Sequence, residues 1–111
     1  MTKTVEIVTF RLNTGCTAQS FAEAAAGIEP FLRETGGMIH RTLSVDAEGL
    51  WTDHILWESE EAAQTAATAV MQHPSAAPMM GMIDGPSAKM RHAVLHLQQR
   101  EGCSSGGSGR R

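Results

Sequence analysis

Two neighbouring segments of the chain, residues 38 to 46 and 50 to 58, hold the side chains best suited to binding a small molecule. Their odd positions include aromatic and charged residues among apolar ones, namely Arg41, Trp51, Asp53 and Trp57. Alternate residues of an extended chain lie on one face, so these four side chains are expected together on one face of a hairpin. Small-molecule sites are mostly apolar with a few polar groups. Together with the methionine-rich run that ends at Met82, this face predicts such a pocket.

The same residues also fit a filled core. In a small domain, large apolar side chains more often pack against one another than line a pocket. Arg41 would then form a cross-strand ion pair with Asp53. A cavity of about 300 Å³ or more beside Trp57 would favour a ligand. A filled core would favour a non-catalytic dimerisation module, and the residues alone leave both alternatives open.

Two histidines, His40 and His54, fall diagonally opposite each other on the even face of the same hairpin. They are close enough there to sense one another's charge. Hydrogen-bonded histidines in a subunit interface are one interpretation, and an interface that responds to pH is the other. We predict that both residues belong to a dimer interface.

The sequence offers no pattern for a metal or a nucleotide cofactor. His92 and His96 are four residues apart, which in a strand separates them by about 13 Å and prevents one metal from binding both. The two cysteines, Cys16 and Cys103, have no CxxC spacing. A glycine-rich phosphate loop and a dinucleotide fingerprint are both lacking. We therefore expect no metal and no cofactor.

The composition fits a single small domain. The chain has 111 residues, of which 41% are hydrophobic and 19% charged, with a formal net charge of −3. An acidic chain argues against nucleic acid as a partner. No apolar run approaches the roughly 20 residues of a membrane span, and no secretory leader is recognised. With few cysteines, the sequence predicts a cytoplasmic protein.

Hydrophobic periodicity and turn signals predict six main elements. Pro30 is expected to kink the end of the first helix, and Ser59 to cap the second. The strands are expected at residues 4 to 12, 38 to 46, 50 to 58 and 89 to 97. The helices are expected at residues 17 to 35 and 59 to 71, with a short third one at 75 to 83.

The loop of the hairpin sets its register. A three-residue loop ending in Gly49, which supplies the positive φ, places Asp46 opposite Leu50. This register keeps the odd residues on one face and the even residues, from Met38 to Glu58, on the other. A loop one residue longer would mix the two sets.

The order strand, helix, strand, strand, helix, strand predicts an α+β fold of the ferredoxin-like split βαβ type, with a four-stranded antiparallel sheet. Two helices cover only one face of such a sheet. The other face also carries apolar residues, including Leu56, so we expect a second copy of the chain to cover it. The domain is expected to span residues 1 to 99, followed by a flexible Gly/Ser/Arg tail at 100 to 111.

The run from Trp57 to Ala62, with His73 at the end of the following helix, resembles the dimeric α/β-barrel proteins, especially those like antibiotic-biosynthesis monooxygenases. The resemblance covers roughly residues 3 to 97. It implies two sheets packed face to face as a homodimeric barrel, with a cavity between sheet and helices in each subunit. Members of the group include cofactor-independent oxygenases of aromatic polyketides, haem-degrading enzymes and many proteins of unknown activity.

The resemblance also raises haem binding, because haem-degrading relatives have a histidine at the position of His73. Those relatives carry a tryptophan earlier on the same helix and an asparagine on the first strand. Here that helix has no tryptophan and residues 4 to 12 have no asparagine. A helix-end role fits His73 better than haem ligation, and His73 remains a candidate for the ligand pocket.

The sequence therefore predicts a homodimeric domain whose pocket binds a small hydrophobic or aromatic molecule. Were the pocket catalytic, Trp57 would stack on an electron-rich substrate, and Asp53 or a histidine would handle the proton. The residues leave open whether it is an enzyme.

Overall fold

The computed structural model describes residues 2–99 of the chain. The predicted tail, residues 100 to 111, lies outside the described residues, so its flexibility and the domain boundary stay predictions. Among the residues that are described, no helix is both long enough and apolar enough to pass through a membrane.

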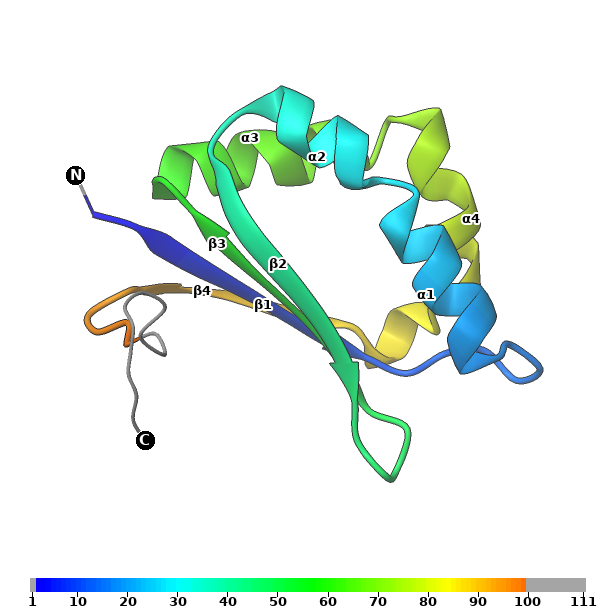
Figure 1. Cartoon of the computed structure of the whole chain (residues 1–111). Helices are drawn as coiled ribbons and strands as arrows, with labels where there is room; N and C mark the ends of the chain where they lie inside the picture. The colour runs from blue at the N-terminus through cyan, green and yellow to red at the C-terminus, as the bar shows by residue number, and fades with distance from the viewer. Residues whose placement is uncertain (1, 100–111) are drawn as a thin grey trace, which may run out of the picture.

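A four-stranded antiparallel sheet forms one layer of the molecule (Figure 1). Its strands are β1 (Thr4–Phe10), β2 (Met38–Val45), β3 (Trp51–Trp57) and β4 (Lys89–Val94). They lie in the order β2-β3-β1-β4, so the first and third strands in sequence are neighbours at the centre. This topology confirms the predicted α+β, ferredoxin-like fold.

The helices all lie on one side of this sheet (Figure 1). They are α1 (Ala18–Ala26), α2 (Glu29–Thr35), α3 (Glu60–Val70) and α4 (Ala77–Met82), with short 3-10 turns at Pro74–Ala76 and Gly85–Ser87. The Thr17 and Ser59 hydroxyls accept hydrogen bonds from the free amides that begin α1 and α3. The core between sheet and helices is built around Phe10, Phe21, Leu32, Ile55, Trp57 and Ala63.

The first helical region is broken rather than kinked. α1 ends at Ala26 and α2 begins at Glu29, with Pro30 in the first turn of α2. In a continuous helix the ring of Pro30 would clash with the carbonyl of Ala26, four residues earlier. The apolar stripe runs through both helices, so the pattern alone predicted a single helix.

The hairpin has the predicted register over most of its length. The Asp46 amide donates to the Leu50 carbonyl over 3.0 Å, and Gly49 has a φ of 89°. The prediction for Met38 is wrong: a bulge between Met38 and His40 places Met38 opposite Trp57 and packs it against the core. A bulge adds one residue to one strand, which moves every residue beyond it to the other face.

A close approach to α3 explains why Gly37, before β2, must be glycine. Its φ is 90°, and a Cβ there would lie 2.6 Å from the Cβ of Ala62. We expect Gly37→Ala to destabilise the fold by about 2 to 4 kcal/mol, from backbone strain and overpacking together. Gly36→Ala is the matched control, since Gly36 has a similar φ but a Cβ added there would meet no atom within 4 Å. Urea unfolding of both variants measures the difference, and equal losses would contradict the close approach.

The face of the sheet that carries no helices is called the open face here. His40 and His54 lie on it with their rings nearly parallel, 6.2 Å apart. After β4 the chain bends back on this side (Figure 1), and Gln98 Nε2 comes within 3.5 Å of His40 Nε2 on the opposite edge strand. The described residues after β4, up to Gln98, therefore cross part of the open face. Leu56, opposite His40 in the register, is only 1% exposed within the single chain.

Candidate functional site

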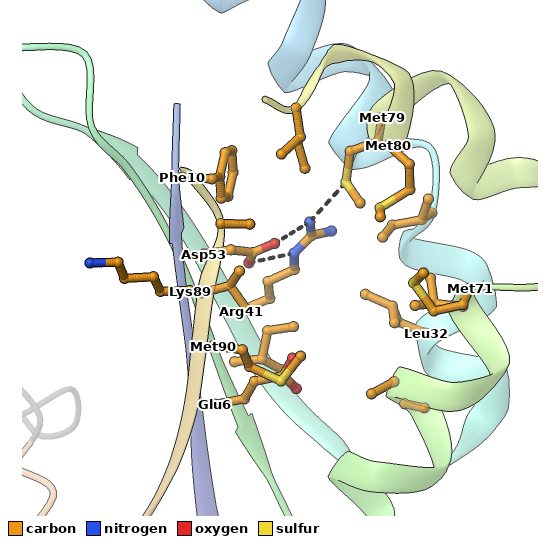
Figure 2. Close-up of a pocket in the computed structure, with 18 of the residues that line it drawn as sticks. Glu6, Phe10, Leu32, Arg41, Asp53, Met71, Met79, Met80, Lys89 and Met90 are labelled. Carbon is orange, nitrogen blue, oxygen red and sulfur yellow. Dashed lines mark hydrogen bonds and ion pairs between the residues drawn. The ribbon is translucent and has the colours of Figure 1, made fainter. Parts of the chain in front are cut away.

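A cavity of about 470 Å³ lies between the sheet and the helices (Figure 2). Its floor is the helix-facing side of β1, β3, β2 and β4, and its roof comes from α2, α3 and α4. Small side chains on α3, Ala66 and Ala67, face it and leave room beneath the helix. Most of its wall is aliphatic, aromatic or thioether, including Val8, Phe10, Leu32, Ile55, Met71, Met79, Met80 and Met90.

Three of the predicted ligand-pocket residues, Trp57, Asp53 and Arg41, line this cavity. Trp51 shares their face of the sheet but is not among the lining residues. It lies in a separate aromatic cluster, with its ring centroid 4.9 Å from Phe21 in an edge-to-face contact and 6.4 Å from Phe10. The two tryptophans of β3 are six residues apart, so they lie under different helices.

The other two predicted pocket residues, His73 and Met82, lie outside the cavity lining. His73 caps the 3-10 turn after α3, with Nδ1 2.7 Å from the Ser75 hydroxyl, and its ring packs 4.0 Å from Phe31. It does not line the cavity. Met82 packs against the core at the end of α4, while Met79 and Met80 of the same helix reach the cavity. Successive residues of a helix point in different directions, so Met79, Met80 and Met82 cannot all face the cavity.

Arg41 and Asp53 form a bidentate ion pair in the cavity wall. Arg41 Nε donates to Asp53 Oδ1 over 2.9 Å and Nη2 donates to Oδ2 over 2.7 Å. Nη1 donates to the Ala25 carbonyl at the end of α1, over 2.9 Å. Figure 2 shows the pair at the centre of the wall, with Met79 Sδ 3.8 Å from Nη2. The donors of Arg41 are thus largely used in joining the sheet to α1, which makes Arg41 a positioning residue.

The sequence interpretation missed Glu6, the second carboxylate in the cavity wall. Glu6 is 7% exposed, and its Oε1 accepts a hydrogen bond of 2.8 Å from Trp57 Nε1. Burial raises the pKa of Glu6, while the hydrogen bond from Trp57 opposes this shift. The alternation of β1 contained a signal: Glu6 shares the inward-facing set with Val8 and Phe10, where a carboxyl group is costly without a role.

The pKa shift of Glu6 predicts how stability responds to pH. An acid with a raised pKa in the folded state contributes stability below its unfolded pKa and loses it as pH rises through the folded pKa. We expect Glu6→Gln, whose amide oxygen still accepts the Trp57 hydrogen bond, to be more stable than the wild type at pH 8. The difference should shrink toward zero at pH 3, below the ordinary pKa of glutamate, where Glu6 is largely protonated in both states. Urea unfolding at the two pH values checks this, and an advantage that grows toward acid pH would contradict it.

The cavity wall therefore holds two carboxyl groups, those of Asp53 and Glu6, which differ in their ability to exchange a proton. The Asp53 carboxylate is held by the Arg41 guanidinium at both oxygens. The Glu6 carboxyl receives one hydrogen bond, from Trp57, among the described residues, and a buried acid with a raised pKa is suited to accepting and returning a proton. The arrangement can accommodate an apolar ring and exchange a proton at Glu6 with a hydroxyl group that the ring carries.

No protein-family model matches the chain, and no curated protein matches it. Solved structures do. SnoaB, a cofactor-independent oxygenase from Streptomyces nogalater, has a TM-score of 0.65 at 14% identity, over 90% of this chain and 97% of its own. A protein from Bordetella bronchiseptica, described as an antibiotic biosynthesis monooxygenase, has a TM-score of 0.71 at 16% identity. The match covers 87% of this chain and 100% of its own.

A third structure is a monooxygenase, the product of ActVA-Orf6 of Streptomyces coelicolor, in complex with the ligand nanaomycin D. It has a TM-score of 0.61 at 21% identity, over 91% of this chain and 94% of its own. At these identities the comparisons bear on the fold, and they agree with the predicted resemblance. The chain has the ferredoxin-like fold of the antibiotic-biosynthesis monooxygenase-like proteins.

Proposed function

We propose that this chain is a small-molecule-binding domain whose cavity takes a small hydrophobic aromatic compound, and that it acts on this compound as a cofactor-independent monooxygenase. The observation that carries the proposal is the cavity itself. It holds about 470 Å³ inside an apolar wall, with the Glu6 carboxyl and the Trp57 ring exposed to the same space. This is the volume and composition usual for small-ligand sites. The oxygenase activities for which SnoaB and the ActVA-Orf6 product are named support the choice of reaction.

Oxygenation without a cofactor requires an electron-rich substrate, and the cavity wall has a group that could make one. A hydroxylated aromatic ring becomes more electron-rich when its hydroxyl proton is removed. Glu6 is the better acceptor for that proton, because Arg41 holds both oxygens of Asp53. The aromatic face of Trp57 and the thioethers of Met79 and Met80 suit a flat, polarisable ring. The helices would shield one side of the reacting ring from water, while Met71 and Met90 of the lining stay exposed to solvent.

The competing function is a dimerisation module with no ligand. It requires a core filled by the chain's own side chains, and the cavity exceeds the volume of about 300 Å³ at which a ligand becomes the better explanation. The open face of the sheet would suit a dimerisation module. A ligand-binding protein of this fold has the same open face, so this feature does not distinguish the two functions.

Tryptophan fluorescence tests the proposed binding directly. In a Trp51→Phe background the remaining Trp57 emission reports on the cavity alone. We expect 1-nitronaphthalene, a hydrophobic quencher, to reduce this emission saturably at micromolar concentration, because the ring packs within contact distance of Trp57. The reverse variant, Trp57→Phe, leaves Trp51 as the reporter and should show only weak, linear quenching. Equal linear quenching in both variants would contradict binding in the cavity.

We also propose that two copies of the chain associate through the open face. The support is its composition: Val5 and Ile7 of β1 lie there only partly covered, and no described helix packs on that side. Leu56, a predicted interface residue, is already buried in the single chain, so Leu56→Glu would also unfold the protein. The predicted interface roles of His40, His54 and Leu56 stay predictions.

Ile7→Glu is the cleaner test of the dimer. A charge at Ile7 would be buried without a partner in the interface, so we expect the dissociation constant to rise by at least about tenfold. Sedimentation velocity over a range of protein concentrations measures it. Thr65→Glu, on the exposed side of α3, is the matched control and should leave association unchanged. A wild-type chain that stays monomeric at high micromolar concentration would rule out the dimer.

A further inference from the structure

Three side chains connect the cavity wall to the outer surface at the start of α3. Glu6 on β1 lies directly opposite His92 on β4 in the register of the sheet. His92 Nδ1 lies 2.9 Å from Oε2 of Glu60, in the first turn of α3. Exposure of the side chains rises outward, from 17% for His92 to 52% for Glu60. The sequence interpretation gave neither His92 nor Glu60 a role in the site.

The second ring nitrogen of His92 is the unusual feature. Nε2 is buried and has no hydrogen-bond partner among the described residues. A carboxylate only accepts hydrogen bonds, so the contact with Glu60 places the proton on Nδ1 and leaves a lone pair on Nε2. A buried polar atom without a partner costs stability. An unpartnered buried atom in a folded protein calls for an explanation, and a catalytic role is one of the recognised ones.

The geometry lets Glu6 and His92 act on each other. Directly opposite residues of an antiparallel pair have Cβ atoms about 4.5 to 5.5 Å apart, so rotation of the Glu6 side chain can present an oxygen to the imidazole. The other charged groups facing Glu6 are Asp53 on β3 and Arg41 on β2, and these two are already paired with each other. His92 is then the neighbour of Glu6 that has a free site for a proton.

We propose that Glu6 and His92 form an acid–base pair that moves a proton between a hydroxylated aromatic ligand in the cavity and the exposed Glu60. The ligand O–H bond breaks and an O–H bond forms on Glu6, leaving the ligand as an anion. Glu6 then passes its proton to Nε2 of His92. His92 releases the proton on Nδ1 to Glu60, which exchanges it with water. The inference rests on the proposed function, because it needs a ligand in the cavity, and it adds the route by which the proton leaves Glu6.

Carboxyl carbon NMR of the protein without ligand tests the coupling first. His92 opposes the effect of burial and lowers the pKa of Glu6, so we expect Glu6 in His92→Gln to titrate at a higher pH than in the wild type. The hydrogen bond from His92 is the largest cause of the lowered pKa of Glu60. We therefore expect Glu60 also to titrate at a higher pH in His92→Gln. His54→Gln, on the open face of the sheet, is the control and should change neither. An unchanged Glu6 titration in His92→Gln would overturn the pair.

Binding of 2-naphthol and naphthalene tests the proton route. A phenol has an ordinary pKa of about 10, so 2-naphthol enters as a hydrogen-bond donor. We expect its affinity to rise about tenfold as pH passes through the Glu6 titration, because a hydrogen bond to a charged acceptor is the stronger one. The rise should disappear in Glu6→Gln and move to higher pH in His92→Gln. Naphthalene affinity should be independent of pH in all three proteins.

The two proposals fail in different ways. If neither compound binds the wild type, the proposed function is wrong and the proton route falls with it. If naphthalene binds and 2-naphthol has the same pH profile in the wild type and in His92→Gln, the cavity is a binding site and only the route is wrong.

Discussion

We expect Arg41→Ala to lower the free energy of unfolding by about 3 to 5 kcal/mol, because it leaves the Asp53 carboxylate buried without its partner. The side chains of Arg41 and Asp53 are each 11% exposed, and the guanidinium donates to both carboxylate oxygens. The substitution also removes the hydrogen bond to Ala25 that joins the sheet to α1. Urea unfolding at pH 7, followed by circular dichroism, measures the loss.

Two further variants test whether burial of the ion pair causes the loss of stability expected in Arg41→Ala. Arg33 and Glu29 form a 2.6 Å ion pair on the exposed side of α2, and Arg33→Ala should cost only about 0.2 to 0.5 kcal/mol. The double variant Arg41→Met, Asp53→Leu removes both buried charges and should recover most of the stability lost in Arg41→Ala. A loss in Arg41→Ala no larger than that in Arg33→Ala would contradict the buried pair.

Filling the cavity has the second large expected effect. Ala67 lines the cavity from α3, and in Ala67→Phe the added ring would occupy the space that we assign to the ligand. We expect affinity for 1-nitronaphthalene to fall by at least about tenfold, since even smaller steric changes in apolar pockets cost that much. The free energy of unfolding should be kept or raised, because the new side chain fills a void.

Thr68→Phe is the matched control for Ala67→Phe. It places the same ring one residue further along α3, where the side chain is exposed. Its affinity should equal that of the wild type. If both variants bind equally well while both remain folded, the ligand binds somewhere other than this cavity.

The parts of the fold that the sequence predicted correctly, such as the hairpin register and the start of α3, depend on residues close together in the chain. Tertiary contacts did not change them. The three-residue loop ending in Gly49 set the hairpin register, and through it the shared face of Arg41, Asp53 and Trp57. The Ser59 hydroxyl and the two acidic residues after it marked the start of α3. Each of these signals lies within a few residues of the feature that it predicts.

The errors in the fold lie where distant packing decides the local structure. The bulge at the start of β2 accompanies the close approach of Gly37 to α3, and nothing near Met38 in sequence announces that contact. The break before Pro30 follows from a backbone clash that hydrophobic periodicity does not describe.

The site was predictable in its strand residues and not in its helical ones. Alternation gave the face of Trp57, but the distinction between Trp57 and Trp51 depends on which helix lies above each ring. Glu6 and His92 are 86 positions apart in the chain and meet only because the central strand β1 pairs with the edge strand β4. The spacing of Glu6 and His92 in the sequence does not predict that their strands pair.

Methionine-methyl NMR tests the central claim, that the cavity binds an aromatic molecule, most directly. The chain has seven methionines, of which Met71, Met79, Met80 and Met90 line the cavity while Met38 and Met82 pack elsewhere. In protein labelled with ¹³C at these methyl groups, naphthalene should shift the four cavity signals saturably, with one common dissociation constant, because ring currents act over short distances. The signals of Met38 and Met82 should move little. Shifts spread evenly over all the methionines, or no saturable shift at the limit of naphthalene solubility, would contradict a ligand-binding cavity.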